Sequence, residues 1–169
     1  MKTTKIRIKF LHTGYERDVM SKEVKNGAVK DLMYPSIAGV GYIGEGYFKT
    51  RHDHKLHYQT WLDMIKRCYK PKDDMTAKTY RGVTVCEEWH NYQNFAKWFD
   101  ENYIEGFKLD KDFKVLGNKV YSPTTCVFLP AEINSFLTGG LKRGIHFCKS
   151  KKKWVAQCQN KELTSSGKN

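Results

Sequence analysis

The sequence is poor in acidic residues, poor in proline and without any long apolar run. Only 18 Asp and Glu residues accompany 30 Lys and Arg residues, so the formal charge is +12. The mean hydropathy is −0.67, and no stretch approaches the roughly 20 apolar residues that a membrane-spanning helix needs. The segment MKTTKIRIKF lacks the apolar region of a secretory signal. We therefore expect a cytoplasmic protein with no membrane partner and with one or two small domains.

Cysteines at disulfide or metal-binding spacing are also lacking. The five cysteines form an odd set without a C-x-x-C pair, which argues against a disulfide framework and against a cysteine zinc site. We predict reduced and mostly buried thiols at these positions, which are Cys68, Cys86, Cys126, Cys148 and Cys158.

The excess of positive charge makes a polyanion the expected partner. Each phosphate that a Lys or Arg neutralises releases condensed counterions, so a pI near 9.4 favours nucleic acid, with double-stranded DNA as the leading candidate. The basic residues are spread over several segments, although an ordinary lysine-rich surface explains any single cluster equally well. The residues that we assign to DNA contact are Lys5, Arg7, Lys9, Lys66, Arg67, Lys119, Lys142, Arg143, Lys151, Lys152, Lys153 and Trp154.

Residues 1–34 predict a basic β-hairpin. The run KIRIKF alternates basic and apolar residues at period two, and Thr13-Gly14 supplies a turn. One face of this ribbon would be apolar, and the other would carry its three cations along a phosphate backbone. Residues 35–57 contain four glycines within PSIAGVGYIGEGY, and we expect a flexible, partly extended linker there.

Two segments have the periodicity of amphipathic helices. From Tyr58, apolar residues recur at spacings of three and four until Pro71. The run EEWHNYQNFAKWFDEN carries an aromatic stripe at the same spacing, which packing demands and which favours a core over a base-stacking platform. The stripe consists of Trp89, Tyr92, Phe95, Trp98 and Phe99.

Residues 109–136 predict a strand, a Gly117-Asn118 turn, a second short strand and a helix opened by Pro130, which together form a ββα unit. GIHFCKSKKKWVAQCQ then predicts a second β-hairpin, and the polar tail KELTSSGKN predicts disorder. The expected fold class is α+β, with an N-terminal β-hairpin, central helices, the ββα unit and a C-terminal β-hairpin.

Histidines at positions 52, 54 and 57 form an H-x-H-x-x-H pattern. A zinc site is conceivable there, but no fourth ligand with suitable spacing follows, so we expect solvent-exposed loop histidines. For His90, beside Trp89, we expect a surface or capping role.

The order of several short motifs resembles a known family. RGVTVCEEW, NFAKWFDEN, LDKD, GNKVYSP and CVFLPAEIN resemble the middle and catalytic region of phage-borne HNH homing endonucleases, which are ββα-metal nucleases. GIHFCKSKKKWVAQC is similar to the first strands of an AP2-type DNA-binding domain. The resemblance covers most of residues 58–158. It implies an HNH-like nuclease domain at 58–138, a truncated AP2-like hairpin with a polar tail at 139–169, and residence in an infected bacterial cell.

The resemblance also implies a site for Mg²⁺ or Mn²⁺. LDKD places Asp110 at the metal-ligand Asp of the first strand, and Asn134 falls at the ligand position of the helix. Lys111 stands where the family has its His general base, and Thr125 stands where it usually has Asn. The His base is therefore missing, and Lys111 and Asp112 are the candidate catalytic residues.

Two functions of different class follow from the sequence. The first is a metal-dependent homing endonuclease, a hydrolase that cleaves or nicks duplex DNA. The alternative is a catalytically degenerate DNA-binding protein, regulatory or accessory to a phage, that keeps the HNH and AP2 architecture. The missing His favours the alternative, whereas the presence of Asp110 and Asn134 favours the nuclease.

Overall fold

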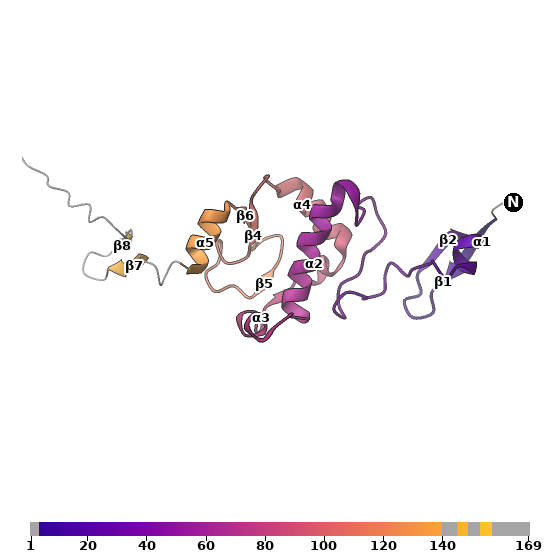
Figure 1. Ribbon diagram of the computed structural model, residues 1–169, viewed down its shortest axis with the longest axis horizontal. Helices are drawn as coiled ribbons and strands as arrows, with labels where there is room; N and C mark the ends of the chain where they lie inside the picture. Colours follow the sequence, from indigo (N-terminus) through magenta and orange to yellow (C-terminus); the bar gives the residue numbers. More distant parts are fainter. Residues whose placement is uncertain (1–3, 140–144, 149–152, 157–169) are drawn as a thin grey trace, which may run out of the picture.

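The computed structural model describes residues 4–139, 145–148 and 153–156, the last two segments and residues 136–139 by their backbone alone. Within these residues the fold is α+β, with small two-stranded sheets and several helices, and no helix there is long and apolar enough to cross a membrane. The elements, shown in Figure 1, are β1 (Lys5–Lys9), β2 (Glu16–Met20), α1 (Ser21–Lys25), the 3-10 helix η1 (His52–His54), α2 (Lys55–Tyr69), α3 (Asp74–Thr79), β3 (Thr84–Val85), the 3-10 helix η2 (Glu87–His90), α4 (Tyr92–Asn102), β4 (Lys108–Asp110), β5 (Val120–Tyr121), β6 (Val127–Leu129), α5 (Ala131–Gly139), β7 (Ile145–Cys148) and β8 (Lys153–Ala156).

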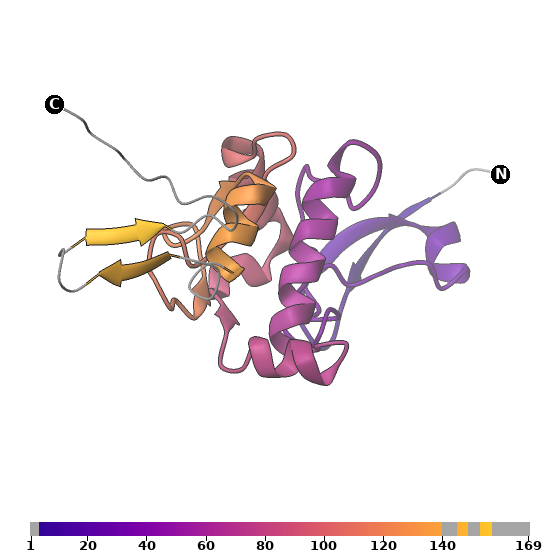
Figure 2. The same cartoon turned by 60° about the vertical axis from the view of Figure 1, so that its left-hand side comes forward.

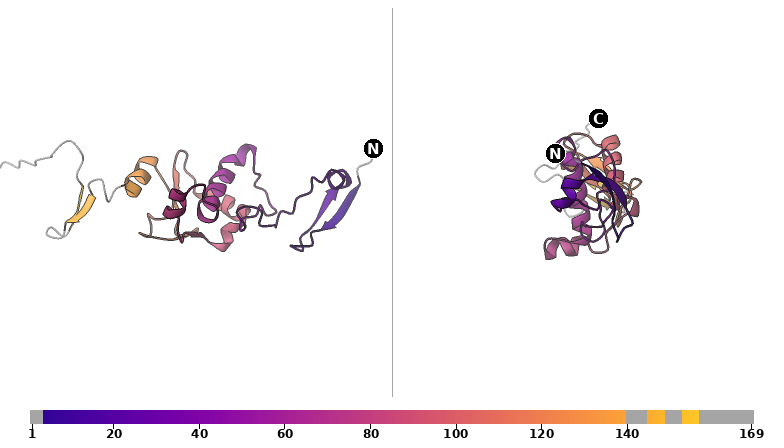
Figure 3. Two further views of the ribbon diagram at one scale, coloured as in Figure 1. Left: turned by 60° about the horizontal axis from the view of Figure 1, so that its bottom comes forward. Right: turned by 90° about the vertical axis from the view of Figure 1, so that its right-hand side faces the viewer.

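The N-terminal hairpin forms as the alternating pattern predicts. Strand β1 pairs antiparallel with β2, from Lys5 opposite Met20 to Lys9 opposite Glu16. The turn between them contains Gly14 at a φ of +72°, a conformation that glycine adopts without strain. Figure 1 and the left view of Figure 3 place this hairpin at one end of the molecule, beyond the helices α2 and α4.

The core lies between α2 and α4, and it is mainly aromatic. Trp61 of α2 donates from its indole nitrogen to the backbone oxygen of Trp89 at 2.7 Å, inside the core. Figure 2 shows α2 as the long central helix. The expected aromatic stripe is confirmed as core for its buried members, which are Trp89, Tyr92, Phe95 and Phe99, while Trp98 packs at the core's edge.

The expectation of a flexible linker at residues 35–57 is wrong, because this segment packs against α2 and α4. Gln93 donates from Nε2 to the backbone oxygens of Ile43 at 3.3 Å and Phe48 at 3.0 Å, and its Oε1 accepts from the Phe48 N–H at 2.9 Å. A side chain at Gly44 or Gly46 would collide with Asn91 or Gln93. The glycines therefore serve close packing here.

The chain from β4 to α5 has the order of a ββα unit. Strand β4 pairs antiparallel with β6, with Asp110 opposite Val127, and α5 begins two residues after β6 ends. Phe128 of β6 stacks on Trp98 of α4 at a ring distance of 5.4 Å, which joins the unit to the core. The short strand β5 pairs parallel with β3 instead, an arrangement that the sequence pattern did not predict.

Helix α3 and the hairpin of β7 and β8 differ in how clearly the sequence predicts them. Helix α3 is not apparent from the apolar pattern, although Asp73 caps it by accepting from the Thr76 N–H at 2.7 Å. Strands β7 and β8 pair antiparallel, from Ile145 opposite Ala156 to Cys148 opposite Lys153, so the second predicted hairpin forms.

Candidate metal centre and nucleic-acid interface

Asp110 is a buried carboxylate fixed at the end of β4. Asp110 is only 6% exposed. Its Oδ1 accepts from the backbone N–H groups of Asp112 at 2.8 Å and Phe113 at 2.7 Å, because the chain leaves the strand in a tight Asx-type turn. Within the described part of the chain, no hydrogen bond engages Oδ2. The Oδ1 oxygen therefore holds the turn.

Asn134 lies in the first turn of α5, where its N–H donates to the Pro130 oxygen at 3.0 Å. Its side-chain Oδ1 is buried, and α5 packs against β4. The expected pair of ligands, Asp110 and Asn134, thus lies on neighbouring elements of one unit. A carboxylate oxygen and an amide oxygen are donors that suit Mg²⁺ or Mn²⁺, and Mg²⁺ commonly fills its other positions with water and substrate phosphate.

No richer metal site is found in residues 4–139. In particular, no group of three or more His, Cys, Asp or Glu side chains among the described residues converges on one point. Asp110 and Asn134 supply two oxygen donors, which is too few for a four-ligand structural zinc.

Lys111, at the position of the expected base, is engaged as a donor. Its side chain is 12% exposed, and Nζ donates to Asp112 Oδ2 at 2.6 Å and to the Asn118 oxygen at 3.0 Å. It also lies 6.0 Å from the centre of the Tyr121 ring. An ammonium that donates to a carboxylate and a carbonyl has no lone pair for a proton. This geometry favours a structural role for Lys111 over the base role that the sequence suggests.

Asp112 is equally constrained. Its Oδ2 belongs to the ion pair with Lys111, and its Oδ1 is shielded from solvent with no hydrogen-bond partner in the described residues. Water does not reach this oxygen in the present arrangement. The base role of Asp112 stays a prediction that needs a rearrangement of the loop.

Asn118 follows Gly117 in the predicted turn, and in the structure it organises the whole loop. Its Nδ2 donates to the backbone oxygens of Lys111 at 2.9 Å and Val120 at 2.6 Å, and its Oδ1 accepts from the Val120 N–H at 3.2 Å. Thr125, which stands where the family usually has Asn, donates to the same Val120 oxygen at 2.8 Å. In the sequence, the Gly117-Asn118 pair, which is typical of a turn, was the signal that could have indicated this role of Asn118.

The basic face of the N-terminal hairpin carries exposed ion pairs at two of its three cations. Arg7 lies 3.4 Å from Asp18 and 3.6 Å from Glu16, and Lys9 lies 3.3 Å from Glu16. The strand register produces these pairs, because Asp18 faces Arg7 and Glu16 faces Lys9. Of the three predicted cations on this face, only Lys5 makes no ion pair within the described residues.

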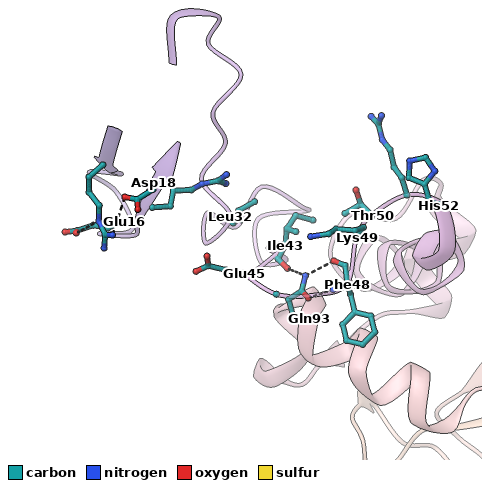
Figure 4. Close-up of a pocket in the computed structure, with 15 residues that line it drawn as sticks. Glu16, Asp18, Leu32, Ile43, Glu45, Phe48, Lys49, Thr50, His52 and Gln93 are labelled. Atoms are coloured by element: carbon teal, nitrogen blue, oxygen red, sulfur yellow. Dashed lines mark hydrogen bonds and ion pairs between the residues drawn. The ribbon is translucent and has the colours of Figure 1, made fainter. Parts of the chain in front are cut away.

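A cleft between the hairpin and the glycine-rich segment gathers cations that the sequence analysis missed. It has a volume of about 840 Å³, and Figure 4 shows Lys49 and His52 on one side with Glu16 and Asp18 on the other. Arg17, Lys49 and Arg51 line it and form no ion pair in the part of the chain that is described. No sequence spacing signals this group, because folding brings residues 17 and 51 together.

Two of the three clustered histidines are not the exposed loop residues that were expected. His57 is half-buried and lies 3.2 Å from Asp100, while His54 accepts from the Lys49 N–H at 3.1 Å through Nδ1. His52 alone is exposed. His90 is half-buried beside the Tyr69 hydroxyl, at 3.3 Å. These contacts give the histidines structural partners.

The remaining expected DNA contacts are dispersed. Lys66 and Arg67 are exposed at the C-terminal end of α2, and Lys119 is exposed before β5. Lys142, Arg143, Lys151 and Lys152 lie outside the described residues, as do the side chains of Lys153 and Trp154, whose backbone forms part of β8.

The described cysteines are free, as expected. Cys126 is buried, and Cys68 and Cys86 are half-buried. Burial raises the pKa of the Cys126 thiol to about 12 and that of Cys68 to about 11, so both stay protonated at neutral pH. The side chain of Cys148 and the whole of Cys158 lie outside the described residues.

Comparison of the chain with protein-family models, with curated proteins and with solved structures finds no match.

Proposed function

We propose that this protein is a metal-dependent DNA endonuclease of the HNH homing type, which nicks or cleaves duplex DNA. The observation that carries the proposal is the Asp110 carboxylate, which is buried and fixed by two backbone N–H groups at the end of β4. Asn134 on the helix that follows β6 supplies a second oxygen in the same unit. The net charge of +12 supports a nucleic-acid partner.

Each group of the site has a separate task under this proposal. A bound Mg²⁺ or Mn²⁺ supplies charge stabilisation at the scissile phosphate and its leaving oxygen. Asp110 and Asn134 would hold that ion, and the Asx-type turn keeps Asp110 in one orientation. Arg17, Lys49 and Arg51 form no ion pair within the described residues and would bind backbone phosphates along the cleft, which Glu16, Asp18 and Glu45 also line.

The second candidate is a DNA-binding protein that keeps the nuclease architecture without cutting. Lys111 favours it, because the residue at the expected base position donates to Asp112 and Asn118. A general base contributes about 10²–10⁴-fold to such reactions. The nuclease proposal therefore predicts slow cleavage unless the loop around Lys111 rearranges on DNA.

A plasmid-relaxation time course separates the two candidates. Supercoiled DNA is incubated with the protein and Mg²⁺ or Mn²⁺, with EDTA as the control, while binding is followed by gel shift. The nuclease proposal predicts nicked or linear product only in the metal samples. Binding without product under every metal condition would leave the DNA-binding protein as the function, and absence of binding at low salt would remove both.

A further inference from the structure

The loop that follows Asp110 exposes large apolar side chains. Phe113 is 54% exposed, Val115 is 52% exposed and Leu116 is 83% exposed. All three lie between positions 113 and 116 of one loop, and this segment is called the apolar tip below. Single exposed apolar residues need no explanation, but a contiguous group of them commonly marks a binding surface.

This tip sits on a firmly anchored loop. The Phe113 N–H donates to Asp110 Oδ1 at 2.7 Å, and the Asn118 N–H donates to the Val115 oxygen at 3.0 Å. Asn118 also ties the loop back to Lys111 through its side chain, at 2.9 Å. The apolar side chains are therefore presented in a fixed place beside the candidate metal ligand, at little further cost in conformational entropy.

The charges around the tip indicate what it meets. Lys114 and Lys119 are both exposed, and residues 113–120 contain no acidic side chain. An apolar tip flanked by cations is complementary to a nucleic-acid groove, whose walls carry phosphates and whose floor exposes the faces of bases once a step is opened. Proteins that bend DNA insert Phe, Leu or Met side chains between base pairs in this way.

We propose that residues 113–117 form an apolar wedge that enters a DNA groove and unstacks a base step. The wedge rests on the proposed function only in taking duplex DNA as the partner, and it applies to a cutting and to a non-cutting protein alike. Leu116 inserts, Phe113 and Val115 support it, and Lys114 and Lys119 bind the phosphates on either side. The wedge favours pyrimidine–purine steps, because these unstack most easily.

The fluorescence of 2-aminopurine tests the wedge directly, since this base brightens when it is unstacked. The probe is an alternating TA duplex with 2-aminopurine in place of some adenines, at low salt and with binding followed by anisotropy. We expect a rise in fluorescence at saturation with the wild-type chain. Leu116→Ala and Phe113→Ala should lose most of that rise while still binding the duplex.

Leu11→Ala is the matched control. Leu11 is 95% exposed at the tip of the N-terminal hairpin loop, so its replacement removes a similar exposed side chain elsewhere. This variant should behave as the wild type. Circular dichroism and thermal unfolding of all three variants confirm folding, which such exposed positions should preserve.

Nicking of plasmid by the same preparations separates the two proposals. No fluorescence rise at saturated binding, or an equal rise with Leu116→Ala, overturns the wedge even where the wild type nicks DNA. A wild-type rise that Leu116→Ala loses, without any nicking, supports the wedge and removes the nuclease proposal. Absence of binding to the probe overturns the wedge together with the DNA partner.

Discussion

Replacing Asp110 by alanine and by asparagine separates two roles of this carboxylate, which are to hold the turn after β4 and to bind the proposed metal ion. Its Oδ1 accepts two backbone hydrogen bonds, at 2.8 Å and 2.7 Å. Hydrogen bonds to charged groups contribute about 1.5–3 kcal/mol each, so losing both should lower the free energy of unfolding by about 3 kcal/mol in Asp110→Ala. Asp110→Asn keeps a neutral acceptor of roughly half the strength, and it should cost about 1–1.5 kcal/mol.

The two variants should differ in stability and agree in chemistry. For a chain of this length, 1 kcal/mol corresponds to roughly 2–4 °C in Tm, so differential scanning calorimetry should resolve them. Both variants lack the carboxylate that would bind the metal, so both should lose metal-dependent nicking. Equal Tm values for the Ala and Asn variants would refute the turn role of Asp110. Undiminished nicking by a folded Asp110→Asn protein would refute its ligand role.

Three further predictions concern the N-terminal hairpin, Cys126 and Lys111. The double change Glu16→Gln with Asp18→Asn frees the hairpin cations, so the slope of log affinity against log salt should steepen by about 1–2, since each new phosphate contact adds about 0.9; an unchanged slope would show that the hairpin does not contact DNA. Burial raises the pKa of the Cys126 thiol from 9.0 to about 12, so its contribution to stability is complete below about pH 9 and is lost as the pH rises through 9 towards 12. Urea unfolding across this range should show the decline, and a flat curve would contradict it. Lys111→His should lower the free energy of unfolding by about 1–3 kcal/mol, because the ion pair with Asp112 is lost, and should raise the nicking rate near neutral pH; a folded variant that cuts no faster would show that the missing His is not the limiting defect.

The elements that the sequence predicted correctly have strong local signals. The alternation in KIRIKF and the Thr13-Gly14 turn specify the first hairpin without reference to the rest of the chain. The aromatic spacing from Tyr92 to Phe99 specifies the core-facing side of α4, because large rings on one side of a helix have to leave water. The ββα order likewise followed from a turn, a short apolar strand and Pro130.

The features that were missed depend on contacts between distant residues. The glycines at positions 39–46 predict flexibility from sequence alone. In the structure, Gln93, about 50 residues away, holds this part of the chain by hydrogen bonds to the backbone of Ile43 and Phe48. The partners of Lys111 depend on a loop that folds back through Asn118, which no periodicity encodes. The parallel pairing of β3 with β5 places Thr84 opposite Val120, far along the chain, and no local pattern encodes such a pairing.

The candidate site likewise contains residues that the sequence predicted and residues that it did not. Asp110 and Asn134 came from the family resemblance, and the structure places them on neighbouring elements. The cations of the cleft, such as Arg17 and Arg51, were not predicted, because they come together only when the hairpin meets the glycine-rich segment. Charge composition favours a polyanionic partner, but it does not indicate which surface would bind one.

The most direct test of the metal-dependent nuclease is the initial rate of plasmid nicking in Mg²⁺, compared at equal DNA occupancy for the wild type, Asp110→Asn and Asp73→Asn. Asp73 is a matched control, because it also accepts a backbone hydrogen bond, at 2.7 Å from the Thr76 N–H, but lies on α3 outside the ββα unit. We predict nicking by the wild type and Asp73→Asn, and none by Asp110→Asn. Equal rates for all three proteins, or no nicking by the wild type at full occupancy, would contradict the account.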